Sequence, residues 1–144
     1  MTLFETPRLL VRELRHSDFP AFHEMQSNPE VMRYTTGTTL NEEENRRDLQ
    51  RLIDLYSAED AEYIAWAIAL QETGTWIGTC TLIHRDGDEY EIGYCLRQNY
   101  WRCGYGTEVV RGLVAFLFTI AGISSLVGYT AKENVASARV LTSA

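Results

Sequence analysis

Near residue 61 the hydrophobic period of the chain changes from 3.6 to 2. Three runs with the shorter period follow one another: "AEYIAWAIAL" (61–70), "WIGTCTLIHR" (76–85) and "YEIGYCLR" (90–97). Short connections, "QETGT" and "DGDE", separate them, and the second contains Asp-Gly, a typical hairpin sequence. The pattern predicts three consecutive antiparallel strands, a meander.

Upstream of the meander, "RLLVREL" (8–14) alternates apolar and polar residues and predicts a short, half-buried strand. A helix is expected from "HSDFPAFHEM", with Ser17 or Asp18 as N-cap and Pro20 in its first turn. Residues 27–39 predict a short helical turn and then a loop. The run "EEENRRDLQRLIDLY" predicts a second helix, capped by Thr39 or Asn41, with one apolar face formed by Leu49, Leu52, Ile53 and Tyr56.

Downstream of the meander, residues 104–121 predict a helix with a broad apolar face, closed by Gly122. "SSLVGYTA" (124–131) predicts one more strand, and "NVASARVL" predicts a last helix with Asn134 near its cap. The order strand, helix, helix, three strands, helix, strand, helix is an α+β pattern.

Composition limits the function classes. A chain of 144 residues, 45% of them hydrophobic, is sized for one compact domain, 1–144. Its net charge of −7 argues against nucleic acid as a partner and favours cationic partners such as amines. Because no apolar run reaches about 18 residues and the N-terminal segment is charged, we expect a soluble, cytoplasmic protein without membrane contact.

Cysteine and histidine usage gives no metal pattern. The three cysteines, Cys80, Cys95 and Cys103, are an odd number without a CxxC pair, which predicts free thiols rather than a disulfide framework or a zinc cluster. The three histidines lack ligand spacing, so we expect no metal cofactor.

Gly104 and Gly106 in "YWRCGYGTEVV" (100–110) stand at the junction of a strand and a helix. Backbone N–H groups at a helix start lack intrahelical acceptors and, with the helix dipole, form an anion site, and glycine lets a phosphate approach the backbone. Taken alone, the pair is also typical of a turn followed by a helix cap. A P-loop is excluded because no Gly-Lys pair occurs, and a Rossmann fingerprint needs a third glycine where Val109 stands.

A wider pattern surrounds this pair. "YEIGYCLRQNYWRCGYGTEVVRGLVAFLF", followed after one strand by "AKENVASARVL", resembles the GNAT superfamily of acyl-CoA-dependent N-acetyltransferases. With "ETPRLLVRELRHSDFPAF" and "NPEVMRYTTG" at the N-terminal end, the chain is most similar to the RimJ/RimL-type branch, and the resemblance covers nearly its whole length. It implies a GNAT-like α+β fold whose central sheet is mixed but mostly antiparallel and flanked by helices.

The resemblance also implies acetyl-CoA as acyl donor and a set of contacts to it. The pantetheine arm is expected in a gap where the "EIGY" strand splays from the next strand, and the pyrophosphate on the loop before the helix. Asn134 and Ser137 match the family's "N-x-x-S", which meets the pantetheine and phosphate region. The expected cofactor-binding residues are Cys95, Leu96, Arg97, Arg102, Cys103, Gly104, Tyr105, Gly106, Thr107 and Asn134.

The chain departs from the family at two places. Arg102 and Cys103 stand where the branch usually has glycine and a basic or amide residue, although the Arg102 guanidinium still suits a phosphate. The family also continues beyond "RVL" with a Gly-Phe turn and a final strand pair that help to shape the acceptor site. The C-terminal strands are therefore expected to be missing: the chain is truncated, another subunit such as a homodimer partner supplies them, or the catalytic apparatus is incomplete.

Candidate catalytic residues come from the same resemblance. Glu91 is the candidate base, because an ammonium must lose a proton before it attacks a thioester; its alternative role is that of a solvated strand residue. No tyrosine follows Tyr129, so Ser137 or a water is the candidate proton donor to the leaving thiolate, or the donor is dispensable because a thiolate is a tolerable leaving group. A backbone N–H near Leu96 is expected to polarise the thioester oxygen. Tyr34 and the loop to Thr39 are expected to form acceptor-site wall or a plain surface loop.

The function expected from the sequence is direct transfer of acetyl to a primary amine, with a protein N-terminal α-amine favoured by the branch. Aminoglycoside or polyamine acceptors are the small-molecule alternative. The other class considered is a non-catalytic acyl-CoA-binding or assembly module, favoured by the short C-terminus and by Arg102 and Cys103.

Overall fold

The computed structural model describes residues 2–33, 35–59, 61–84 and 90–119 in full, and the backbone of 126–131 and 137–138. Its strands are β1 (Thr2–Glu5), β2 (Leu9–Glu13), β3 (Tyr63–Leu70), β4 (Trp76–His84), β5 (Tyr90–Leu96), β6 (Leu126–Ala131) and β7 (Ser137–Ala138). Its helices are α1 (Phe19–Gln26), α2 (Pro29–Met32), α3 (Glu42–Asp54) and α4 (Tyr105–Thr119), with single 3₁₀ turns at His16–Asp18, Leu55–Ser57 and Gln98–Tyr100.

The strands form one sheet in the order β1-β2-β3-β4-β5-β6-β7. Neighbours are antiparallel except β5 and β6, which are parallel and joined through α4. The meander predicted from the change of period is therefore present as β3, β4 and β5. The mixed, mostly antiparallel sheet expected for a GNAT-like fold is confirmed.

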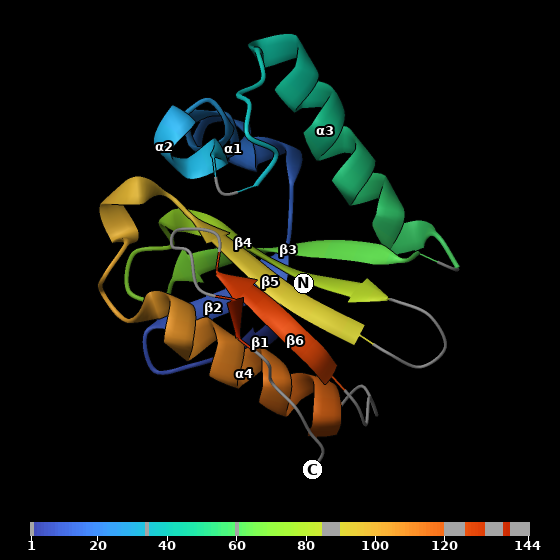
Figure 1. Cartoon of the computed structure of the whole chain (residues 1–144), viewed down its shortest axis with the longest axis vertical. Coiled ribbons are helices and arrows are strands. Elements are labelled where there is room, and N and C mark those ends of the chain that lie inside the picture. The colour runs from blue at the N-terminus through green and yellow to red at the C-terminus, as the bar shows by residue number, and fades with distance from the viewer. Residues whose placement is uncertain are drawn as a thin grey trace.

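Helices cover both faces of the sheet. In Figure 1, α4 lies against one face and α1, α2 and α3 gather over the other. On the α4 face, buried side chains of the sheet such as Ile68, Ile92 and Leu96 pack with Val109, Leu113 and Leu117. On the α1–α3 face, Ala65, Ala67 and Cys95 pack with Phe22, Met25 and Leu49. Because side chains alternate along a strand, β5 sends residues into both cores.

The helix starts follow from local chemistry. Asn41 caps α3, accepting a hydrogen bond from the Glu44 N–H while the Glu44 carboxylate accepts one from the Asn41 N–H, each at 2.9 Å. Asp18 precedes α1 as expected, but its side chain makes no cap bond. Instead it is buried and accepts hydrogen bonds from the Arg12 guanidinium at 2.8 and 2.9 Å, which ties α1 to β2.

Two expectations about the elements need correction. The predicted helix over "NVASARVL" is wrong at residues 137–138, because β7 pairs there with β6, Ser137 opposite Thr130 and Ala138 opposite Tyr129. This pairing gives hydrogen-bond partners to a strand edge. The strand β1 was not predicted from the sequence. The expected hairpin turn after His84, the Gly122 cap and Asn134 lie outside the described residues.

Candidate active site

The last residues of β5 lie where the resemblance places the pantetheine arm, and their side chains alternate between the two faces of the sheet. Cys95 points to the α1–α3 face and is 8% exposed, whereas Leu96 points to the α4 face and is 1% exposed. The last register pair between β5 and β6 is Tyr94 with Ala131, and β5 continues to Leu96. Within the described residues, the pairing of β5 with β6 therefore ends two residues before the end of β5, next to the position where the resemblance implies a splay.

Arg97, the third residue expected at the pantetheine arm, is engaged in the fold itself. Its N–H donates to the Ile77 carbonyl at 2.8 Å, and its carbonyl accepts from the Tyr100 N–H at 2.9 Å. Its guanidinium donates to the Trp76 carbonyl at 2.9 Å and to Glu24 at 3.1 Å. The backbone N–H and carbonyl of Arg97 therefore both have partners within the fold.

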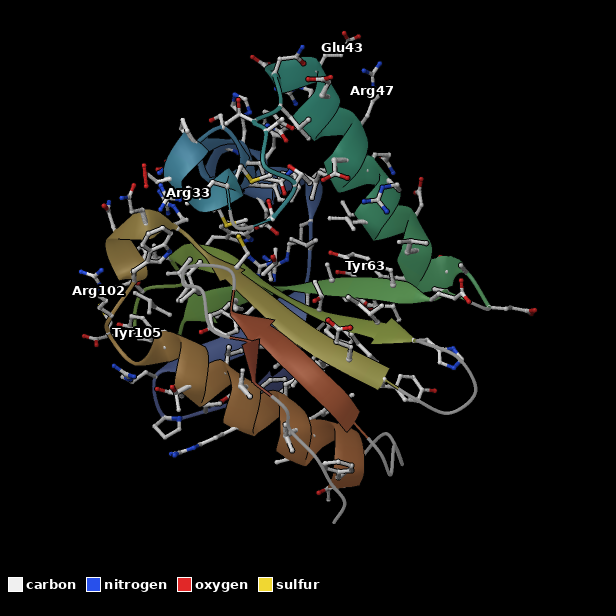
Figure 2. All side chains as sticks on the ribbon, viewed as in Figure 1. Arg33, Glu43, Arg47, Tyr63, Arg102 and Tyr105 are labelled. Carbon is white, nitrogen blue, oxygen red and sulfur yellow. The ribbon has the colours of Figure 1, made fainter. Side chains whose placement is uncertain are left out.

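Residues 102–107, which we call the glycine loop, lead from β5 into α4. Arg102 and Gly104 both have positive φ, +61° and +84°. Residues 102, 103, 104 and 107 are exposed, and Arg102 points outward from the loop (Figure 2). Within the described parts of the chain, the backbone N–H groups of 102–107 make no hydrogen bond. Successive N–H donors with left-handed residues among them are typical of an anion-binding nest at a helix start.

The two glycines of the loop have different surroundings. Among the described residues, a Cβ added at Gly104 would meet only the Arg8 guanidinium, at 3.3 Å, which leaves room for a ligand at its backbone. A Cβ added at Gly106 would overlap the ring and hydroxyl of Tyr94, which is buried on β5. Gly104 therefore fits the role of a glycine that lets phosphate approach. Gly106 is required by the packing of α4 on the sheet.

A cluster of contacts, here called the Arg8–Glu108 brace, holds the loop from outside. The Arg8 guanidinium donates to the Glu108 carboxylate at 2.7 Å and to the Cys103 carbonyl at 3.0 Å, and it lies 4.3 Å from the centre of the Tyr105 ring. The Arg8 N–H and the Thr6 hydroxyl also donate to Glu108, at 2.8 and 2.5 Å. The turn between β1 and β2 is thereby fixed to the first turn of α4.

The brace shifts the pKa values of its ion pair. The hydrogen bond to Glu108 raises the pKa of Arg8. Partial burial opposes ionisation of Glu108, but the hydrogen bonds from Thr6 and Arg8 outweigh it and lower the pKa of Glu108. A cavity of about 550 Å³ opens beside the brace; Arg8 in the β1–β2 turn, Gly104 and the α4 residues Thr107 and Arg111 are among the residues that line it.

On the α1–α3 face a second cavity, of about 350 Å³, lies between the helices and the sheet. We call it the helix–sheet pocket. Tyr63, labelled in Figure 2, stands on β3 where the sheet passes under α3. The lining residues are Gln26, Met32, Thr35, Thr36, Leu40, Asp48, Arg51, Tyr63, Thr79, Thr81 and Cys95. The pocket thus reaches the end of β5, and Thr35 and Thr36 bring to it the loop that was expected to wall the acceptor site.

Of the candidate catalytic side chains, Glu91 and Ser137, the structure describes only that of Glu91. Glu91 is half-buried on β5, opposite Ile83 and Gly128, and by strand alternation it shares the face of Cys95. It does not line the helix–sheet pocket. Ser137 is paired through β7, with its side chain outside the described residues, as is all of Asn134. The Leu96 carbonyl accepts a hydrogen bond from the Trp101 indole at 2.9 Å.

Two further kinds of feature, a metal-binding cluster and a membrane-spanning helix, are absent from the described part of the chain. No group of three or more His, Cys, Asp or Glu side chains there is arranged to hold a metal ion. No helix there is both long and apolar enough for a membrane span.

Comparisons with known proteins agree with this geometry. A sequence profile of the acetyltransferase (GNAT) domain family matches residues 8–144. An uncharacterized N-acetyltransferase, p20 of Bacillus licheniformis, is 30% identical over 99% of this chain and 81% of its own length. A GNAT-family acetyltransferase from Bacillus anthracis has the same fold, with a TM-score of 0.77 and 22% identity over 90% of this chain and 72% of that one.

A further solved structure is described as RimL, a ribosomal L7/L12 alpha-N-protein acetyltransferase in complex with coenzyme A. Its TM-score is 0.73 at 16% identity, and it covers 90% of this chain and 73% of that one. The chain belongs to the GNAT acetyltransferase family. It is therefore an N-acetyltransferase, an enzyme of a fold that uses acetyl-CoA as acyl donor.

Proposed function

We propose that the protein transfers acetyl from acetyl-CoA directly to the N-terminal α-amine of a peptide or protein. The observation that carries the proposal is that the suggested donor site and the helix–sheet pocket both reach the end of β5. The glycine loop and the end of β5 suit the donor, and the helix–sheet pocket reaches the same strand end at Cys95, from the α1–α3 face. A donor and an acceptor that meet at one strand end can react in a single step.

The donor side fits coenzyme A by its chemistry. The N–H groups of 102–107, which make no hydrogen bond within the described residues, are donors for a pyrophosphate. The open backbone at Gly104 admits it, and Arg102 adds an exposed cation. The backbone of Cys95 and Leu96 faces the pantetheine arm. When bound, acetyl-CoA supplies an activated thioester.

The residues of the chain would then act on the amine. Because Glu91 does not line the helix–sheet pocket, it takes through a water the proton that an α-ammonium must lose before it can attack. The Leu96 N–H stabilises negative charge that develops on the thioester oxygen. Ser137 returns a proton to the leaving thiolate, and Asn134 completes the contacts to the donor. The RimL structure that shares this fold is named for acetylation of a protein α-amine, which supports this choice of acceptor.

The acceptor class is tested by thiol release from acetyl-CoA across a panel of amines. Peptides with a free N-terminus are the expected substrates, with mass spectrometry placing the acetyl group on the α-nitrogen. Peptides blocked at the N-terminus but containing lysine are the control and should be inert. Turnover only with polyamines or aminoglycosides contradicts the proposed acceptor, and donor binding without release on any amine contradicts transfer.

The donor site is tested with a matched pair of alanine variants. Gly104 and Gly74 both have positive φ, +84° and +77°, and Gly74 has open space around it in the β3–β4 turn. Alanine at either position strains the backbone by roughly 1–2 kcal/mol. Only Gly104→Ala should weaken acetyl-CoA binding, on the order of tenfold if one charge-assisted hydrogen bond is lost. Equal affinities of the two variants in calorimetry contradict a phosphate role for the loop.

A further inference from the structure

The helix–sheet pocket contains a carboxylate that the family resemblance did not identify. Asp48 on α3 is the one acidic residue among the described residues that line the pocket, and its side chain is 23% exposed. The walls around it carry threonine hydroxyls, which accept hydrogen bonds from neutral and charged groups alike. The carboxylate is therefore the feature of the pocket that distinguishes a cation from a neutral ligand.

A buried amide network holds this carboxylate in place. The Asn45 side chain is 0% exposed, and its amide N–H donates to the Leu40 carbonyl at 3.2 Å, which fixes the orientation of the Asn45 amide. The Asn45 side-chain oxygen then accepts from the Gln26 amide at 2.8 Å. The other contact of that Gln26 nitrogen is to Asp48, at 3.0 Å. Gln26 is thus oriented as a donor toward Asp48, on the pocket side of α3.

Asp48 retains capacity to accept further hydrogen bonds. Among the described residues, its two oxygens accept one bond each, from Gln26 at 3.0 Å and from Arg51 at 2.8 Å. An ionised carboxylate offers about four acceptor positions. The Arg51 side chain is 58% exposed, and an ion pair of this kind at the surface contributes little and rearranges easily. A ligand ammonium can therefore join or replace Arg51 at Asp48.

We propose that Asp48 receives the ammonium group of the acceptor and so selects a cationic amine for the pocket. The inference rests on the proposed function, because it assigns the helix–sheet pocket to the acceptor. Removing the charge of Asp48 and removing the charge of Arg51 should then change acceptor binding in opposite directions. Loss of the Asp48 charge weakens acceptor binding, whereas loss of the Arg51 charge removes a competitor and tightens it.

The variants are Asp48→Asn and Arg51→Gln, with Asp54→Asn as control. Asp54 is exposed on the same helix and also accepts a bond from a glutamine amide, Gln50, at 2.8 Å, so its change of charge matches that at Asp48. We expect Asp48→Asn to raise KM for the amine on the order of tenfold or more, with KM for acetyl-CoA unchanged. Arg51→Gln should lower KM for the amine, and Asp54→Asn should leave both constants unchanged.

Two peptides that differ only in the terminal amine distinguish a loss of ammonium recognition from a folding defect. The wild type should be inhibited more strongly by the amine-bearing peptide than by the same peptide with hydrogen in place of the terminal amine. Asp48→Asn should remove this preference. If Asp48→Asn keeps the wild-type preference, the role of Asp48 is refuted while peptide acetylation stands. If the wild type acetylates only small amines, the proposed acceptor fails, and the same pairwise comparison with those amines still decides the role of Asp48.

Discussion

Replacing Gly106 with alanine sets two effects of opposite sign against each other. Alanine is favoured over glycine in a helix by up to about 1 kcal/mol. Against this, the new methyl would overlap the ring and hydroxyl of Tyr94, a side chain only 7% exposed in the core between β5 and α4. Overpacking of a core typically costs 1–3 kcal/mol. Because several atoms of a rigid ring are affected, we expect Gly106→Ala to lose about 1–2 kcal/mol net.

The free energy of unfolding in urea measures this loss, and a double-mutant cycle locates it. Tyr94→Leu destabilises on its own by removing part of the core, but it also removes the ring that the alanine would meet. In the Tyr94→Leu background, Gly106→Ala should therefore be neutral or stabilising. A Gly106→Ala single variant as stable as the wild type, or more stable, refutes the packing role. The role expected from the resemblance, contact with the cofactor, then remains for Gly106.

Two other predictions concern stability. Arg102 has φ +61°, so Arg102→Gly should remove left-handed strain and stabilise by roughly 0.5–1 kcal/mol after the entropy of glycine is subtracted, while weakening acetyl-CoA binding through the lost cation. Thermal unfolding and calorimetry measure the two effects, and a loss of stability contradicts the strain. Burial raises the pKa of Tyr56 from 10.0 to about 12, so stability should fall as pH rises from 10 toward 12, since the unfolded chain loses that proton first. Tyr56→Phe should remove this part of the slope, and an unchanged slope contradicts the assignment.

The parts of the fold that the sequence predicts well have strong periodic patterns. β3, β4 and β5 are largely buried, α3 and α4 each have an apolar face, and α3 has an N-cap at Asn41. β1 was missed because it is a short edge strand of exposed and half-buried residues, which carries little burial signal. The last helix was predicted from the run "NVASARVL" with Asn134 near its cap, and at Ser137–Ala138 the structure instead has β7, paired with β6.

Only those parts of the candidate site that lie within one short segment of the sequence could be predicted. The glycine loop was found because its signal, Gly-x-Gly before a helix, is local. Asp48 was missed because its significance depends on Gln26 and on a sheet that follows α3 in the chain. Its one local signal was the Asp48–Arg51 spacing on α3, which is equally typical of a solvated helix surface.

The Arg8–Glu108 brace shows why a glycine loop alone does not define a phosphate site. N–H groups bind an anion only if the loop keeps them directed at it, and Arg102 introduces strain at the first residue of this loop. The brace opposes that strain from two sides, since Arg8 holds the Cys103 carbonyl and Glu108 holds the Arg8 backbone and side chain. It also places a positive charge beside Glu108, whose carboxylate would otherwise repel a phosphate at the same helix start. The turn between β1 and β2 thus belongs to the proposed donor site, although it contributes none of the N–H groups of residues 102–107.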